Sequence, residues 1–176
     1  NPLLQVESAS SNDYARASFI FNGATSVGPG LWFGKSRGTS VGSNTIVNDG
    51  DQVGGFFFHA ADGTDKFSRV ASIEVKVDGT PGSNDTPGRI TFATTADGAD
   101  GTTERMRIDS SGRVGIGTTS PAQLLEIHGA SNPAVLLKDT TNNVLSYLYS
   151  QDLVGAVGTA SNHPFVFNVN DGEKMR

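Results

Sequence analysis

The sequence contains no cysteine, which excludes a disulfide framework and any metal site built from thiolate ligands. Hydrophobic residues make up only 36% of the 176 residues, and no apolar run approaches the roughly 20 residues that a membrane-spanning helix needs. Basic residues are also sparse, since 13 Lys and Arg stand against 18 Asp and Glu, without a basic cluster. We therefore expect neither nucleic-acid binding nor membrane insertion.

Glycine, by contrast, is abundant. The 22 glycines are nearly twice the average share, which is about 7% of residues. Because glycine adds no side-chain volume, little material remains for a large core within one chain. Chains of this kind often complete their burial by association, so the composition is compatible with an oligomer.

The stretch from Glu104 to Pro121 organises the chain. Met106 and Ile108 alternate with Arg105 and Arg107, which is the period-2 pattern of a half-buried strand. The following residues, 109–112, read Asp-Ser-Ser-Gly, and this composition favours a tight turn.

A second short strand follows this turn. Val114 and Ile116 share one face, whereas Gly115 and Gly117 leave the other face without side chains. Glycine at these positions indicates that something approaches the backbone closely, and a neighbouring copy of the strand is the simplest candidate. The candidates for packing between subunits are Met106, Ile108, Val114, Gly115, Ile116 and Gly117.

This stretch resembles a segment common in tail fibres and related appendages of tailed bacteriophages. The resemblance extends upstream through residues 77–85 and 89–98, and it covers roughly residues 49–129. In that family the segment often precedes a self-cleaving chaperone domain of the endosialidase type. The present sequence shows no chaperone-like segment, so the resemblance implies nothing about self-cleavage here.

The resemblance implies an extracellular virion component used in host attachment. Because such fibres are generally three-fold, it also implies a homotrimer, with other virion tail proteins and host-surface polysaccharide as partners. The fold class expected is all-β: an elongated, intertwined homotrimeric fibre resembling a β-prism or a triple β-helix.

The rest of the chain also reads as strands, which recur every 10 to 15 residues between Gly, Asn and Asp turns. The expected strands are residues 17–21, 31–33, 45–47, 56–58, 72–78, 89–94, 124–128, 135–137, 144–149, 154–157 and 165–169. Three consecutive phenylalanines at 56–58 predict a strand buried from both sides. Ser120 and Pro121 would also suit a helix start, but we favour the strand at 124–128.

Short similarities suggest that the chain contains two copies of one unit. Leu3-Leu4-Gln5-Val6 is similar to Leu124-Leu125-Glu126-Ile127, and Glu104-Arg105-Met106-Arg107 is similar to Glu173-Lys174-Met175-Arg176. We therefore expect a longer first unit at 1–123, with the family-like segment at 49–120, and a shorter second unit at 124–176, truncated at its end. Regular β-architecture without duplication is the alternative.

No motif for catalysis, metal binding or a cofactor emerges. The acidic turns at 49–51, 62–65 and 97–101 lack the ligand spacing of an EF-hand, so we interpret them as turns. The three histidines, at 59, 128 and 163, are far apart and are expected to be surface or packed residues.

Neither the carboxylates nor the aromatic residues form a defined motif. Glu74, Glu104 and Glu126 alternate with apolar neighbours, which predicts solvated strand faces and argues against a catalytic pair. Weak candidates for sugar contact are Trp32, Tyr147 and Tyr149, because ring faces stack on pyranose surfaces. Trp32 stands between Leu31 and Phe33, so core packing is the favoured interpretation for it.

The sequence therefore predicts a non-catalytic, structural and adhesive segment of a phage tail fibre. Two alternatives belong to other classes. One is a fragment of a polysaccharide-degrading tailspike, which would require a long parallel β-helix. The other is a bacterial trimeric surface adhesin of similar β-fibre construction.

Overall fold

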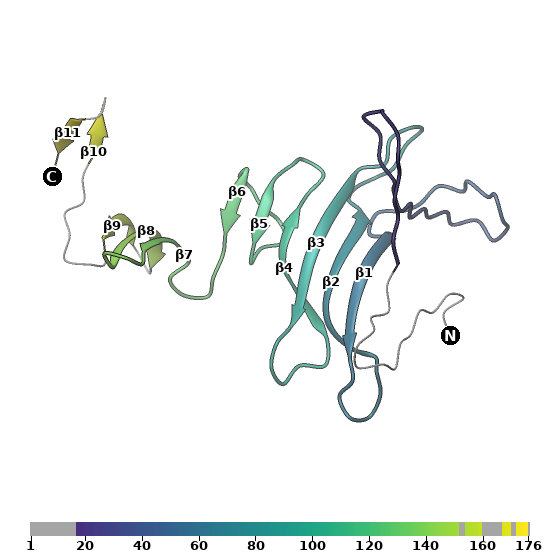
Figure 1. Ribbon diagram of the computed structural model, residues 1–176, viewed down its shortest axis with the longest axis horizontal. Helices are drawn as coiled ribbons and strands as arrows, with labels where there is room; N and C mark the ends of the chain where they lie inside the picture. Colours follow the sequence, from purple (N-terminus) through teal and green to yellow (C-terminus); the bar gives the residue numbers. More distant parts are fainter. Residues whose placement is uncertain (1–16, 152–153, 160–166, 170–171, 176) are drawn as a thin grey trace. The chain divides into compact units, whose positions relative to one another are not determined.

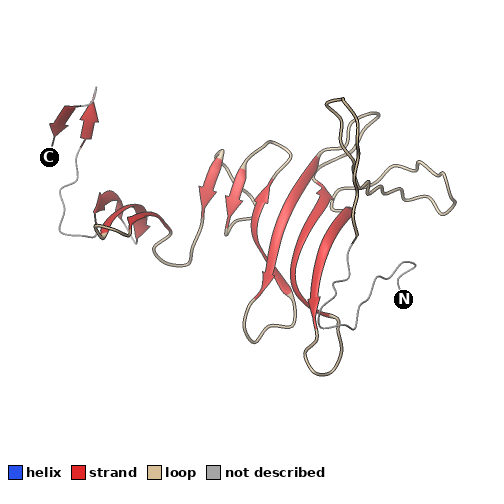
Figure 2. Cartoon of the chain, in the orientation of Figure 1, coloured by secondary structure: helices blue, strands red, loops and turns tan. Residues whose placement is uncertain are grey.

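The computed structural model describes residues 17–151, 154–159, 167–169 and 172–175, and every regular element among them is a strand (Figure 2). The expected all-β class is confirmed for this part of the chain. It contains no helix capable of crossing a membrane. Two compact units are separated at one boundary, Asn1–Gly34 and Lys35–Arg176.

Six strands form the main sheet, in which each strand pairs with the next one along the chain (Figure 1). They are β1 (Gln52–Ala60), β2 (Ser68–Val77), β3 (Gly88–Thr95), β4 (Thr102–Ile108), β5 (Val114–Ile116) and β6 (Leu125–Ile127). Pairing is antiparallel from β1 to β5, and β6 then runs parallel to β5. The strands expected at 72–78, 89–94 and 124–128 are confirmed.

The β4–β5 turn has the chemistry that its sequence predicts. Asp109 Oδ1 accepts hydrogen bonds from the backbone N–H groups of Ser111 and Arg113, both at 2.9 Å. Gly112 adopts a φ of +76°, which glycine tolerates and other residues rarely adopt. The turn fixes the register that places Ile108 opposite Val114 and Met106 opposite Ile116.

The chain after β6 forms two smaller sheets. One has the order β7 (Ala134–Asp139), β8 (Val144–Gln151) and β9 (Val154–Thr159), and the other pairs β10 (Phe167–Val169) with β11 (Gly172–Met175). The expected strands at 135–137, 144–149 and 154–157 are confirmed. Of the strand expected at 165–169, residues 165 and 166 lie outside the described residues.

Three expected strands are wrong. Residues 17–21, 31–33 and 45–47 are extended or irregular but belong to no sheet. A strand needs a neighbouring strand for its backbone hydrogen bonds, and the described part of this chain supplies none to these segments. The alternating residue pattern of these segments is therefore insufficient to form strands within one copy of the chain.

The burial expected for residues 56–58 is also wrong. They lie in β1, which is an edge strand of the main sheet, and both Phe56 and Phe58 are about half exposed. The apolar run indicates a strand correctly, but nothing in the described chain covers both of its faces.

The main sheet continues across the boundary expected between the two sequence units. β6 follows residue 123 and nevertheless pairs with β5, which precedes it. Residues 3–6, the first partner of the proposed repeat, lie outside the described residues. The duplication therefore stays a prediction.

Candidate assembly surface

One face of the six-stranded sheet is apolar. Paired residues on neighbouring strands share a face, so the register places twelve exposed or half-buried apolar side chains on one side, beside Ala71 and the buried Val77 of β2. We call this set the open face: Phe56, Phe58, Ile73, Val75, Ile90, Phe92, Met106, Ile108, Val114, Ile116, Leu125 and Ile127. Arg105, displaced by a bulge in β4, donates to Thr94 Oγ1 beside it.

None of the twelve side chains of the open face is buried. Ile90, near the middle of the sheet, is 40% exposed, and Ile116 is 39% exposed. The buried apolar side chains of the described chain are Val77, at the end of β2 beside the Asn48–Asp51 turn, and Pro121, in the loop before β6. A hydrophobic surface of this extent on one chain is typical of an interaction site.

The opposite face of the sheet is polar, and it is better covered than the open face. Ser72, Glu74 and Thr91 are all buried there, with Glu74 only 8% exposed. Ser72 donates a 2.8 Å hydrogen bond to Glu74, and the Lys76 ammonium lies 3.1 Å from the same carboxylate. The expectation of a solvated face at Glu74 is therefore wrong, because long charged side chains lie along the sheet and cover it.

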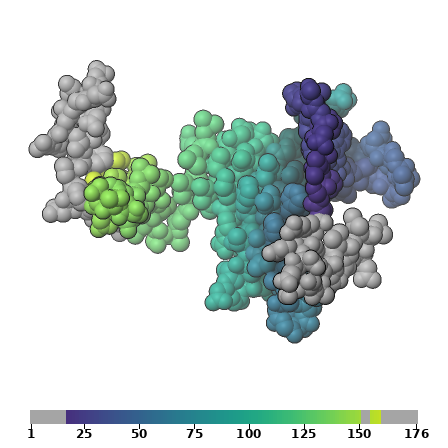
Figure 3. All heavy atoms as spheres, viewed as in Figure 1, coloured from purple at the N-terminus to yellow at the C-terminus, as the bar shows by residue number. Residues whose placement is uncertain are grey.

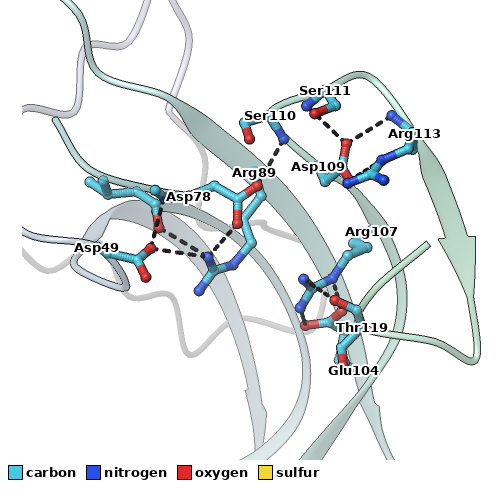
Figure 4. A network of polar contacts seen from close by, with 12 residues as sticks. Asp49, Asp78, Arg89, Glu104, Arg107, Asp109, Ser110, Ser111, Arg113 and Thr119 are labelled. Carbon is cyan, nitrogen blue, oxygen red and sulfur yellow. Dashed lines mark hydrogen bonds and ion pairs between the residues drawn. The ribbon is translucent and has the colours of Figure 1, made fainter. Parts of the chain in front are cut away.

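Arg107 ties this polar face to the loop after β5. Its guanidinium donates to both carboxylate oxygens of Glu104, at 2.5 and 2.9 Å, and to the backbone carbonyl of Thr119 at 2.6 Å (Figure 4). A two-point pair of this kind fixes orientation as well as charge. Glu104 is therefore held as an ion-pair partner.

A second group of charges connects three loops at one end of the sheet (Figure 4). Arg89 donates to Asp78 at 2.7 Å, and its guanidinium lies 3.8 Å from Asp49. The other oxygen of Asp78 accepts the backbone N–H of Ser110 at 2.8 Å, which links β2 to the β4–β5 turn. This network was not predicted from the sequence, because its members come together only through strand register.

Asp78 and Asp109 have lowered pKa values. Burial alone would raise the pKa of Asp78, but hydrogen bonds from the Ser110 backbone and Arg89 outweigh it. Burial likewise opposes the lowering at Asp109, where the backbone and side chain of Arg113 prevail. In the β1–β2 loop, the Ser68 hydroxyl and the Thr64 and Asp65 amides lower the pKa of Asp62 from 3.8 to about 2.

Acidification is expected to destabilise the fold. A carboxylate whose pKa is lower in the folded than in the unfolded chain stabilises the fold at pH values above its unfolded pKa, which is about 4. That stabilisation is lost as the pH falls through the folded pKa. Melting temperatures should therefore fall between about pH 4 and pH 2. Asp62→Asn with Asp78→Asn should lower stability at neutral pH and flatten this acid loss, whereas Asp97→Asn, in an exposed turn, should follow the original curve. A melting temperature independent of pH would contradict the assignment.

The close backbone approach expected at the glycines is present within the chain. A Cβ atom at Gly115 would lie 2.7 Å from the carbonyl oxygen of Thr118. Gly117 has a φ of +73°, and a Cβ there would overlap the backbone carbonyl of His128. The neighbour is thus the chain's own loop and β6, whereas Met106, Ile108, Val114 and Ile116 lie on the open face.

The aromatic candidates lie in two different settings. Core packing of Trp32 is wrong, because Trp32 is 94% exposed. Tyr147 and Tyr149 lie on one face of β8, with ring centroids 4.9 Å apart and planes inclined by 57°. Their cross-strand neighbours are the small residues Gly158 and Ala156 in β9, and Leu136 and Ala134 in β7.

The acidic turns at 49–51 and 62–65, and the histidines at 59 and 128, use polar side-chain atoms in contacts within the chain. Asp51 forms a two-point pair with Arg37, and the backbone N–H of Gly79 donates to Asp49 at 2.9 Å. A ring nitrogen of His59 lies 2.8 Å from the carbonyl oxygen of Phe67, and that of His128 lies 2.6 Å from Glu126. No cluster of three potential metal ligands occurs among the residues described, and His163 lies outside them.

Comparison with known proteins gives a likeness in structure but none in sequence. No family model matches the chain, and no curated protein matches it either. A solved structure does. It is the carboxy-terminal domain of the L-shaped tail fibre of bacteriophage T5, with 8% sequence identity and a TM-score of 0.48, over 92% of this chain and 96% of that one. This likeness concerns the arrangement of the chain, and it assigns no residue a role.

Proposed function

We propose that this chain is a structural segment of a phage tail fibre and that it assembles as a homotrimer through the open face. The observation that carries the proposal is the contrast between the two faces of the sheet: the apolar face is uncovered, whereas the polar face is covered by its own side chains. The resemblance of residues 49–129 to tail-fibre segments supports two further parts of the proposal, the three-fold symmetry and the extracellular, virion-bound location.

The proposed role is structural: the segment supports the fibre and displays its host-contacting surface, without catalysis. A general acid at neutral pH requires a raised carboxyl pKa. The pKa of Glu126 is instead lowered by hydrogen bonds from the Ala122 backbone and His128. At Glu74 burial would raise the pKa, but Ser72 and Lys76 outweigh it and the pKa is again lowered. Glu104 is paired with Arg107, so each of the three strand carboxylates is already held by hydrogen bonds from neighbouring groups.

Host-surface polysaccharide is the proposed ligand of the attachment role. Tyr147 and Tyr149 supply two adjacent rings with hydroxyl groups, above small residues of β9. A trimer would present this pair three times and so strengthen a weak contact by effective concentration. The fibre would join other virion tail proteins at its ends.

Light scattering on the purified chain tests the assembly. We expect a mass three times that of the 18.3 kDa chain. Association is expected because one copy leaves the apolar face in water, and the factor of three comes from the resemblance to tail-fibre segments. A stable folded monomer over the micromolar range would contradict the proposal.

Incubation of the same protein with host-surface polysaccharide tests the absence of catalysis. We expect no new reducing ends and no unsaturated products, because the carboxylates are already held by hydrogen bonds and, at Glu74 and Glu104, by ion pairs. Product release that scales with protein, and that disappears in Glu104→Gln or Glu126→Gln, would favour the tailspike enzyme instead. Arg37→Gln, at an exposed pair distant in sequence, serves as the matched control.

A further inference from the structure

A second uncovered apolar surface precedes the main sheet. Residues 17–34, which we call the arm, form an extended loop that doubles back on itself (purple in Figure 1) and appears as a narrow column in Figure 3. Ile20 is 78% exposed and Trp32 is 94% exposed, and Phe19, Phe21, Val27 and Leu31 are also exposed. An arm of this composition would be unfavourable in water.

The arm also contains no charged residue. Its eighteen residues include no Asp, Glu, Lys, Arg or His, although charged residues make up 18% of the whole chain. The twelve side chains of the open face are likewise uncharged. The apolar parts of the two surfaces can therefore meet without removing an ion from water, and Arg105, at the bulge in β4, is a charge beside the open face.

The arm is also large enough, in apolar area and in length, to cover much of the open face. The exposed apolar side chains of the arm amount to roughly 700–900 Å², taking about 150–250 Å² for each aromatic residue. A standard interface buries about 800 Å² on each partner. Five extended residues span about 16 Å, and the distance from β1 to β4 across the sheet is about 14 Å. The segment 17–21 is therefore long enough to cross most of the open face.

We propose that the arm of each copy lies across the open face of a neighbouring copy. This inference rests on the proposed self-assembly and names the segment that covers the face. Every copy brings one arm and one face, so the two surfaces are supplied in equal number. An arm-to-face contact joins different patches on the two partners, and a rotation that closes such contacts produces a ring, as in a trimer.

Trp32 provides a direct readout, because it is the only tryptophan in the sequence. In the assembled wild-type chain we expect its fluorescence to be blue-shifted and protected from acrylamide. On dilution, the emission should shift to longer wavelength at the concentration where light scattering records dissociation. Emission typical of water-exposed tryptophan in a trimer would overturn the arm inference and leave the proposed assembly intact.

Mixing two variants shows whether the arm binds its own chain or a neighbour. The arm variant carries Ile20→Asp and Trp32→Asp, and the face variant carries Ile90→Asp and Ile116→Asp. Each variant on its own should fail to assemble. Refolded together with different tags, they should form mixed species, because an intact arm of one chain meets an intact face of the other.

The remaining outcomes of these experiments distinguish the arm inference from the proposed assembly. An arm variant that assembles like the wild type would overturn the inference, and so would the absence of mixed species, since an arm bound within its own chain cannot be complemented. Retained far-UV circular dichroism of the arm variant would exclude misfolding, because the arm contains no strand. Monomeric wild-type protein would instead refute the proposed assembly itself.

Discussion

Replacing Gly117 by alanine is expected to lower the free energy of unfolding by about 2–5 kcal/mol, whereas Gly112→Ala should lower it by about 1–2 kcal/mol. Both glycines have positive φ, +73° and +76°, so both substitutions incur backbone strain. The glycines differ in their surroundings: a Cβ at Gly117 would overlap the His128 carbonyl, whereas nothing lies within 4 Å of one at Gly112.

The additional cost at Gly117 arises from the junction of β5 and β6. Gly117 donates its N–H to the carbonyl of Arg105 at 2.9 Å, while His128 N–H donates to the carbonyl of Ile116 at 2.8 Å. Backbone is therefore fixed on both sides, and the overlap cannot be relieved by rotating a side chain. Relief requires moving β6 away from β5, which would break their hydrogen bonds.

Chemical denaturation of the two variants measures this difference. Gly112→Ala is the control, because it reproduces the strain without the overlap. Equal loss of stability in both variants would mean that β6 moves away at no cost, and would contradict the close packing of β6 on β5.

Ile90→Asp is expected to convert the assembled protein to monomers. Within one copy Ile90 is 40% exposed, so a carboxylate there can reach water at small cost. Once a neighbour covers the open face, the same carboxylate is buried without a partner. An uncompensated buried charge costs about 3–5 kcal/mol, and a trimer would incur this cost three times.

Val41→Asp is the matched control for this substitution. It introduces the same charge at a fully exposed loop residue outside the main sheet. Light scattering should record an unchanged mass for Val41→Asp and a single-chain mass for Ile90→Asp, with similar circular dichroism for both. An Ile90→Asp protein that keeps the wild-type mass would show that the open face faces water.

The sequence by itself determined the class of fold and most of the strands. The alternation in 72–78, 89–94 and 104–108 predicted strands that the sheet contains, because side chains of a strand alternate between its faces. The turn at 109–112 was also predictable, since its Asp and Gly act on neighbouring backbone. The glycines at 115 and 117 indicated a close approach of backbone.

The tertiary structure decided which surfaces are covered. Residues 17–21 alternate as strands do, yet they join no sheet in the described chain, because a strand requires a hydrogen-bonding neighbour that local sequence does not specify. The close approach to Gly117 proved to come from His128 of the same chain. Burial of Glu74 and exposure of Ile90 likewise depend on strand register, which brings together side chains far apart in the sequence.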